Sequence, residues 1–404
     1  MNIAMFSDNF YPELSGISDS IIDLARGLVK LGHRIHLYVP KYSETDFRMY
    51  GVPVAELDLD PAIAVHRLPS VRYPAPTNQG RIVLPTFFRS LSVRQNKIHI
   101  VHTHLFFGVG MEGLAASRFL KIPLVGTSHT PIADFLRYSP IGNRLSQRLA
   151  KAFVSWYYNH CTFVSAPSNG ILAEMKTNGF KQPCNVISNP IDLSTFTPAR
   201  SPEERTRIRL ELNLSGFIVL YTGRLAVEKH VDVIIRAIAV VKEYIPKISF
   251  VITGHGQQEQ SLKRLANELH VEDCVAFLGT VSVSDLARLY KAADVFTITS
   301  TAETQSLSLM KAMATGIPVI GVNARGLSEY INKHNGLLVE PGDYRGLAAT
   351  ILHLCRNPQL REDLGKGGLK IVQQWSSERI TNEWDALYRE ICSHTISNRY
   401  GITN

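Results

Sequence analysis

The most restrictive feature of this sequence lies in residues 293–321, where an apolar run, a polar loop, a helical pattern and a second apolar run follow one another. The two apolar runs, 293–298 and 317–320, have the length of buried strands. Gly316 stands where the helix between them should end. The order predicts one parallel βαβ unit, whose polar loop lies at the carboxyl end of a strand and at a helix N-terminus. Open α/β sheets bind anionic ligands at such a place.

The same alternation runs through both halves of the chain. Expected strands are 2–6, 34–39, 98–102, 124–127, 163–166, 185–188, 217–221, 249–253 and 275–278; expected helices are 17–31, 109–120, 144–158, 231–244, 257–269 and 282–292. This pattern predicts an α/β protein of two tandem, doubly wound Rossmann-like domains. We place the first domain at 1–192, joined by a returning C-terminal helix at about 379–404, and the second at 193–378. A ligand cleft is expected where the domains face each other.

Composition limits the class of protein further. The chain has 404 residues, of which 45% are hydrophobic and 19% charged, as in a soluble globular protein of two domains. No apolar run reaches eighteen residues, so no transmembrane helix is expected, and the N-terminus is typical of a first strand rather than a signal peptide. Five scattered cysteines predict reduced thiols, no zinc site and a cytoplasmic location.

The net charge of +8 is concentrated in the first half. Residues 61–170 hold twelve Lys and Arg but only two acidic residues, Glu112 and Asp134. Within this region, four basic residues (Arg137, Arg144, Arg148 and Lys151) alternate with apolar and aromatic ones: Phe135, Leu136, Tyr138, Leu145, Leu149, Phe153, Trp156 and Tyr157. An anionic membrane surface is one interpretation, and a core-facing helix with a basic outer face is an equal alternative. Nucleic acid is disfavoured, because no nucleic-acid-binding motif occurs.

Polar loops at expected strand ends contain the candidate site residues. In the first half, Gly16 opens a helix and lets a backbone approach a ligand, and His129 follows a strand, where it could contact a hydroxyl or be a satisfied structural histidine. His102 and His104 are weaker candidates of the same kind. The absence of a complete GxGxxG motif argues against a dinucleotide cofactor.

In the second half, Arg224 and Lys229 stand in one short loop before a helix, and two cations beside a helix N-terminus could bind a diphosphate. The alternative is a solvated basic loop. Glu303 is expected away from the phosphates, where it would accept hydrogen bonds from sugar hydroxyls. The turn of Gly254 and Gly256 could admit a base or ribose.

Taken together, these residues resemble family 4 of the glycosyltransferases, which are retaining enzymes of the GT-B fold. The run Gly223-Arg224-Leu225 with Glu228 and Lys229 matches the family's GRLxxEK motif. The resemblance implies that the first domain binds the acceptor and the second a UDP- or GDP-linked sugar. It assigns catalytic roles to His129, Arg224, Lys229 and Glu303, and donor contacts to Gly16, Gly254, Gly256, Gln305, Ser306, Leu307 and Lys311. It implies no metal and no cofactor besides the nucleotide-sugar substrate.

The sequence departs from the family pattern at three positions. Ser306 and His230 each stand where the family usually has a glycine. Lys311 stands where the family usually has a second glutamate. In the family this glutamate binds the ribose hydroxyls, and an ammonium cannot accept those hydrogen bonds. Losing a charged hydrogen bond costs roughly 1.5–3 kcal/mol. An alternative function is therefore a catalytically impaired nucleotide-sugar sensor or partner subunit. A GT-B epimerase is disfavoured by the GRLxxEK match.

The resemblance thus implies a hexosyltransferase that moves a sugar to an acceptor hydroxyl. The expected acceptor is a membrane lipid or lipid-linked glycan, which the basic region 61–170 would help to approach. We expect a cytoplasmic protein, peripheral on the inner face of the membrane.

Overall fold

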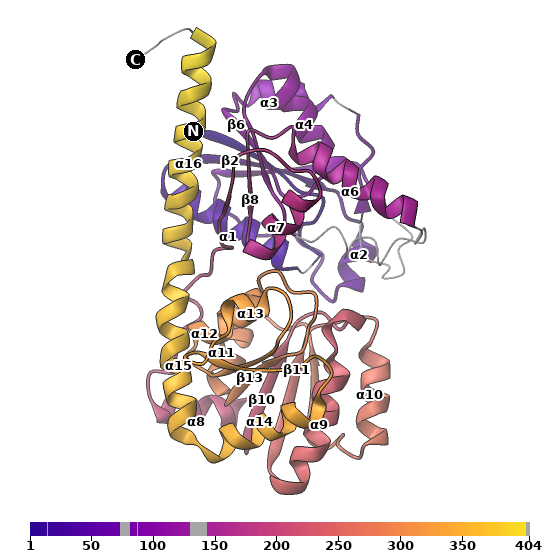
Figure 1. Cartoon of the computed structure of the whole chain (residues 1–404), viewed down its shortest axis with the longest axis vertical. Coiled ribbons are helices and arrows are strands. Elements are labelled where there is room, and N and C mark those ends of the chain that lie inside the picture. Colours follow the sequence, from indigo (N-terminus) through magenta and orange to yellow (C-terminus); the bar gives the residue numbers. More distant parts are fainter. Residues whose placement is uncertain (14, 73–80, 87, 130–143, 401–404) are drawn as a thin grey trace. The chain divides into compact units, whose positions relative to one another are not determined.

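The computed structural model describes residues 1–13, 15–72, 81–86, 88–129 and 144–400. The chain forms two compact units, one of Met1–Pro190 with Ser377–Asn404 and one of Ile191–Ser376. Each unit is built around its own parallel sheet with helices on both faces (Figure 1).

The first unit contains a seven-stranded parallel sheet in the order β3-β2-β1-β6-β7-β8-β9. Its strands are β1 (Asn2–Phe6), β2 (Arg34–Pro40), β3 (Ile63–Leu68), β6 (Ile100–Thr103), β7 (Leu124–Thr127), β8 (Phe163–Ala166) and β9 (Cys184–Val186). A short antiparallel pair, β4 (Val71–Arg72) and β5 (Arg81–Ile82), lies outside it. Because β2 and β3 extend the sheet on one side of β1 and β6 to β9 on the other, the strand order reverses between β1 and β6.

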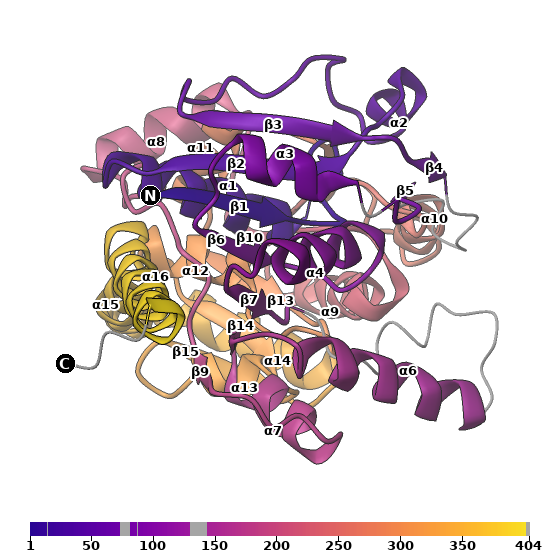
Figure 2. The same cartoon turned by 90° about the horizontal axis from the view of Figure 1, so that it is seen from above.

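Helices cover the two faces of this sheet unequally. On one face lie α3 (Arg89–Gln95), α4 (Gly108–Leu120), α6 (Arg144–Tyr158) and α7 (Asn169–Thr177), as Figure 2 shows. On the other face α1 (Gly16–Lys30) packs against α16 (Ser377–Tyr400), the last helix of the chain. The short helix α2 (Glu44–Met49) follows β2. The core on the α1 side therefore combines residues from both ends of the sequence.

The second unit contains a six-stranded parallel sheet in the order β12-β11-β10-β13-β14-β15. Its strands are β10 (Phe217–Thr222), β11 (Ile248–Thr253), β12 (Val275–Gly279), β13 (Val295–Ile298), β14 (Val319–Val322) and β15 (Gly336–Val339). Every residue of β10, β13 and β14 is buried, as expected for parallel strands covered on both faces. The strand order reverses between β10 and β13.

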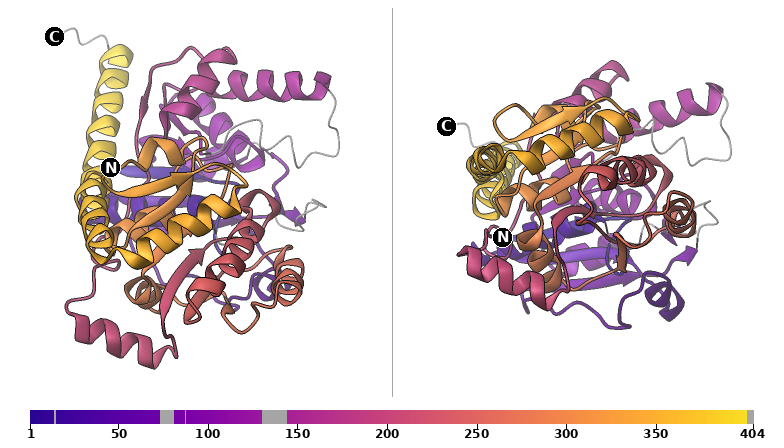
Figure 3. Two further views of the ribbon diagram at one scale, coloured as in Figure 1. Left: turned by 60° about the horizontal axis from the view of Figure 1, so that its bottom comes forward. Right: turned by 90° about the horizontal axis from the view of Figure 1, so that it is seen from below.

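Helices also cover both faces of the second sheet (Figure 3). One layer consists of α9 (Val231–Tyr244), which packs against α10 (Glu259–Glu268) and α14 (Tyr344–Arg356). In the other layer α8 (Pro202–Glu211) packs against α11 (Val283–Ala292), and α12 (Leu307–Ala314) against α15 (Pro358–Val372). The short α13 (Leu327–Tyr330) follows β14.

The βαβ unit predicted from residues 293–321 is present as β13, α12 and β14. Gly316 ends α12 with φ +72°, a conformation that residues with a side chain rarely adopt. The sequence analysis did not assign β3, β15, α7, α8, α14 or α15. Among the described residues, no helix is long and apolar enough to cross a membrane.

The basic region 61–170 is less positively charged in space than in sequence. Arg67 forms an ion pair with Glu56, and Arg72 and Arg81 both pair with buried Asp46. Burial raises the pKa of Asp46, but hydrogen bonds from Ser43, Arg81 and Arg72 outweigh it and hold that pKa at about 2. Glu56 and Asp46 precede residue 61, so the charge of residues 61–170 alone does not include them. The surplus positive charge remains on α3, on α6 and at the end of α4, where Lys121 follows Arg118.

Candidate functional site

Three loops of the second unit meet where its strand order reverses. Residues 223–229 follow β10, residues 254–258 follow β11, and residues 299–306 follow β13. Because β10 pairs with both β11 and β13, the carboxyl ends of all three strands lie side by side. This switch point is the usual ligand position in open parallel sheets.

Both candidate cations lie at this edge, and each is paired with a carboxylate. Lys229 donates from Nζ to Oε1 of Glu303 at 2.5 Å, which joins the loops after β10 and β13. Arg224 donates from Nη2 to Oε1 of Glu228 at 2.8 Å, and the backbone carbonyl of Arg224 accepts from the hydroxyl of buried Tyr221. The two carboxylates hold the cations in place while the side chains stay partly accessible to a ligand.

The two glycines of the β11 loop allow it to lie against the β10 loop. A Cβ atom on Gly254 would come within 2.0 Å of the Gly223 carbonyl oxygen, and one on Gly256 within 2.2 Å of that of Leu225. The backbone of Leu225 also donates to the carbonyl of His255 at 2.9 Å. Any larger residue would separate the loops, so these glycines have a packing role besides any ligand contact.

His230 begins α9 with φ 49° and ψ 42°, in the left-handed region. A non-glycine residue in this region costs about 1–2 kcal/mol, a cost that glycine would not have. The loop after β13 holds this turn, because Thr299 donates from Oγ1 to the carbonyls of Lys229 and His230 at 2.9 and 2.8 Å. The ring of His230 also lies 3.3 Å from the Thr301 hydroxyl.

The candidate residues after Glu303 have clear local roles. Ser306 is the N-cap of α12 and accepts from the backbone N–H of Leu309 at 3.3 Å, while Gln305 and Leu307 are buried. The ammonium of Lys311 lies over the face of buried Phe196, 5.2 Å from the ring centroid. A cation–π contact of this kind stabilises the charge by about 0.5–2 kcal/mol. It gives Lys311 a packing partner that a glutamate would not have.

In the first unit, the switch point between β1 and β6 holds a buried carboxylate. Asp8 follows β1 and accepts hydrogen bonds from the backbone N–H groups of Val109 and Gly110, at 2.7 and 3.2 Å, in the first turn of α4. Burial raises the pKa of Asp8 to about 6. Gly16 is the first residue of α1, whose N-cap, Ser15, accepts from Ser18 N–H and donates to Asn9.

His129 belongs to a group of three buried histidines. His104 follows β6 and His129 follows β7, and Nδ1 of His104 lies 3.1 Å from Nε2 of His129. The ring of His102 packs against that of His104 with centroids 4.1 Å apart. Burial lowers the pKa of His129 to about 4 and that of His102 to about 3, so both are neutral at pH 7.

The structure thus brings Arg224, Lys229, Glu303, Gly254 and Gly256 to one sheet edge, and His129 to the corresponding edge of the first unit. The sequence analysis missed three residues: Asp8, Glu228 as the partner of Arg224, and Tyr388. The position of Asp8, directly after the first strand, could have indicated it. Tyr388 lies far away in the sequence, and no local pattern indicates its contact with His102.

Comparisons with known proteins identify the family and the fold. Residues 14–195 match the family model described as Glycosyltransferase Family 4, and residues 202–371 match the one described as Glycosyl transferases group 1. An alpha-monoglucosyldiacylglycerol synthase of Streptococcus pneumoniae is 28% identical over 90% of this chain and 80% of its own length. Another, of Acholeplasma laidlawii, is 25% identical over 97% of both chains. The structure of Anabaena HepE in complex with UDP superimposes with a TM-score of 0.76, at 20% identity, over 96% of this chain and 100% of that chain.

The two family models together match nearly the whole chain, and the chain belongs to the family 4 glycosyltransferases, with the GT-B fold. It is an enzyme, a hexosyltransferase that uses a nucleotide-sugar donor.

Proposed function

We propose that this enzyme transfers a hexose from a UDP- or GDP-linked donor, with retention of configuration, to a hydroxyl of a membrane lipid or lipid-linked glycan. The observation that carries the proposal is the position of Arg224 and Lys229 at the switch point of the second sheet, with Glu303 bonded to Lys229. Two guanidinium or ammonium groups at a helix N-terminus suit a diphosphate. The two lipid glucosyltransferases among the relatives support the acceptor class.

Each residue has a proposed task in this reaction. Arg224 and Lys229 neutralise the charge that develops on the leaving diphosphate, which is the main electrostatic contribution to the rate. The leaving phosphate takes the proton of the acceptor hydroxyl. Glu303 accepts hydrogen bonds from the sugar, and neutral His129 contacts a sugar hydroxyl. When the donor binds, Lys229 exchanges part of its bond with Glu303 for phosphate oxygens.

The direct test is turnover with defined substrates. Purified protein is incubated with UDP-glucose, UDP-galactose or GDP-mannose and vesicles that contain diacylglycerol or a monoglucosylated diacylglycerol. The anomeric proton coupling in the lipid product, read by NMR, reports its configuration. A product of inverted configuration contradicts the retaining mechanism, and transfer only to water-soluble acceptors contradicts the lipid acceptor.

We further propose that the face of the first unit formed by α3, α4 and α6 binds an anionic membrane surface. Helix α6 exposes four large apolar residues at helical spacing next to Arg148 and Lys151, and each is at least 41% exposed: Leu145, Leu149, Phe153 and Trp156. Apolar side chains among cations are typical of helices that lie in a membrane interface. The other residues of this proposed region, 130–143, lie outside the described part of the chain.

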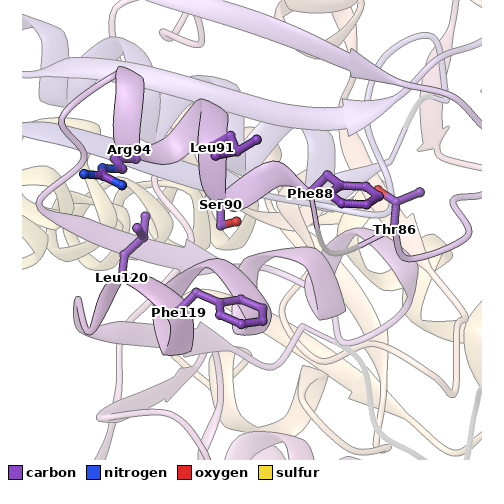
Figure 4. A pocket seen from close by; sticks show the side chains of 7 residues that line it. All are labelled: Thr86, Phe88, Ser90, Leu91, Arg94, Phe119 and Leu120. Atoms are coloured by element: carbon purple, nitrogen blue, oxygen red, sulfur yellow. The ribbon is translucent and has the colours of Figure 1, made fainter.

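An apolar pocket between α3 and α4 adds to this face (Figure 4). It has a volume of about 400 Å³, and Phe88, Leu91 and Phe119 line it while being 75%, 61% and 69% exposed. Arg94 also lines it. Between residues 83 and 129 the sequence has one acidic residue, Glu112, which is buried and accepts hydrogen bonds from Thr86. The segments on which this pocket is built therefore carry more basic than acidic residues.

Co-sedimentation with vesicles tests the membrane proposal. The protein should bind vesicles that contain phosphatidylglycerol but not pure phosphatidylcholine, and salt should release it. Leu149→Ser and Phe88→Ser should each weaken binding several-fold, whereas Leu210→Ser, at an equally exposed position of α8, should not. Equal loss in all three variants, or binding that ignores lipid charge, contradicts the assignment of this face.

A further inference from the structure

The last helix of the chain contacts the histidine group of the first unit. The hydroxyl of Tyr388 lies 2.6 Å from Nδ1 of His102, and the ring of Trp384 lies against that of His102 with centroids 4.6 Å apart. Tyr388 and Trp384 follow each other by one helical turn on α16 and are both buried. Both also belong, with Ile380 and Ile391 of the same helix, to the apolar core on this face of the sheet. Tyr388 adds a polar contact to this apolar packing, and Asp385 of the same helix makes a separate one with Nε2 of His33 at 2.8 Å.

A continuous set of hydrogen bonds fixes the ring of His102. Its Nε2 lies 2.7 Å from Oγ1 of Thr127, which lies 2.7 Å from Oγ of Ser165, so the set crosses β6, β7 and β8. Burial raises the pKa of Tyr388, which keeps its hydroxyl protonated. Because His102 is the one hydrogen-bond partner of this buried hydroxyl among the described residues, we assign Tyr388 as the donor to Nδ1, which leaves the proton of neutral His102 on Nε2. Without Tyr388, His102 would lose the partner that selects this tautomer.

His102 in turn supports the pair that contains His129. Its ring packs on His104, and Nδ1 of His104 bonds Nε2 of His129. His104 is 2% exposed, and its Nε2 has no hydrogen-bond partner among the described residues. His104 is thus held by one hydrogen bond and by ring packing, so its orientation depends on the position of His102.

We propose that Tyr388 and Trp384 are positioning residues for His129, acting through His102 and His104. The inference rests on the proposed contact of His129 with the sugar, and it adds a requirement that residues of α16 set the geometry of that contact. A shift of a contact group by about 1 Å can lower a rate by about a hundredfold. Loss of a single hydroxyl, with the rings kept, should have a smaller effect.

The test compares Tyr388→Phe with Tyr38→Phe. Both variants remove one hydroxyl from a buried tyrosine of the first unit. The Tyr38 hydroxyl lies 2.9 Å from Oγ of Ser92, and no hydrogen bond found among the described residues joins it to the group of three buried histidines. We expect Tyr388→Phe to lower kcat about tenfold with a donor KM changed less than twofold. We expect Tyr38→Phe to leave kcat within twofold of the wild type at a similar loss of melting temperature.

A spectroscopic readout separates positioning from stability. In protein labelled with ¹⁵N-histidine, long-range ¹⁵N–¹H spectra distinguish the two tautomers, with His102→Gln, His104→Gln and His129→Gln used for assignment. Tyr388→Phe and Trp384→Leu should change the signals of His102 and His129, and Tyr38→Phe should not. Unchanged histidine signals and kcat in Tyr388→Phe overturn the inference.

His129→Ala separates this inference from the proposed function. If His129→Ala keeps full turnover, the assignment of His129 to the reaction is wrong, and the inference is wrong with it. If His129→Ala loses turnover while Tyr388→Phe behaves as Tyr38→Phe does, only the inference is wrong.

Discussion

Replacing Glu303 by glutamine should tighten the binding of a free nucleoside diphosphate while it lowers the rate of sugar transfer. In the structure the Glu303 carboxylate forms an ion pair with Lys229, one of the two cations proposed to bind the diphosphate. The ligand must share or displace that bond, and it must also approach a negative charge. Glutamine removes both costs, yet it is a weaker hydrogen-bond acceptor towards the sugar.

The exposure of the Lys229–Glu303 ion pair sets the size of the expected gain in binding free energy. The side chains of Lys229 and Glu303 are 20% and 12% exposed, so the pair lies between exposed ion pairs, worth about 0–1 kcal/mol, and buried ones, whose disruption costs about 3–5 kcal/mol. We take about 1–2 kcal/mol as the gain on binding. Since 1.4 kcal/mol is a factor of ten, the dissociation constant should fall by about five- to thirtyfold.

Isothermal titration calorimetry with UDP and with GDP measures the gain in nucleotide affinity. The value of kcat with the sugar donor measures the expected loss of transfer rate. The gain in affinity should shrink as ionic strength rises, because it is electrostatic. Glu204→Gln, which removes a carboxylate paired with Lys291 between α8 and α11 at a comparable exposure of 17% and 18%, is the control and should change binding much less. Weaker nucleotide binding by Glu303→Gln would refute the reasoning, since it would show that the carboxylate organises the diphosphate site rather than competing for Lys229.

Three further predictions concern the donor site and the buried histidines. Arg224→Ala and Lys229→Ala should each lower kcat/KM about a hundredfold or more in a donor turnover assay, whereas Lys242→Ala, which breaks an ion pair with Asp273, should not; near wild-type rates in both would contradict the diphosphate assignment. Lys311→Glu should tighten donor binding about tenfold, read by thermal shift, while Lys311→Met, which keeps the packing on Phe196, should have little effect; weaker binding of the glutamate variant would show that Lys311 contacts the donor itself. Because the folded-state pKa values of His102 and His129, about 3 and 4, lie below the usual 6.5, the stability they contribute is present above pH 6.5 and is lost as pH falls towards 4. Urea unfolding at pH 7.5 and 5 should show this loss, opposed by Asp8, whose raised pKa favours the folded state below about pH 6; stability that is equal at both pH values would contradict the neutral state of the histidines.

Strongly periodic local patterns made most of the fold predictable. The runs that became β10, β13 and β14 are short, mostly apolar and wholly buried, and Gly316 ends a helix where the pattern placed its end. The elements that were not assigned carry weaker signals. Strand β3 is mostly half-buried, and α8 is a charged helix with one buried residue, Ile208.

The candidate site was predictable where motif and topology coincide, and not where contacts join distant segments. Arg224, Lys229 and Glu303 follow adjacent strands, so their proximity follows from the parallel sheet. The pairing of Arg72 and Arg81 with Asp46 joins β4 and β5 to α2, and no periodicity in the sequence encodes that contact. The contact between His102 and Tyr388 spans 286 positions, and only tertiary packing reveals it.

The core of the first unit combines residues from both ends of the sequence, and this has a consequence for biosynthesis. One face of its sheet is covered by α1 together with Ile380, Trp384, Tyr388 and Ile391 of α16. On the ribosome, residues Ile191–Ser376 must be made before that helix emerges, which takes roughly 10–40 s at ~5–20 residues per second. During this interval the nascent first unit presents an uncovered apolar sheet face, a substrate for chaperones that hold such surfaces. Moving α16 ahead of β1 by circular permutation should shorten the exposure and reduce aggregation during expression.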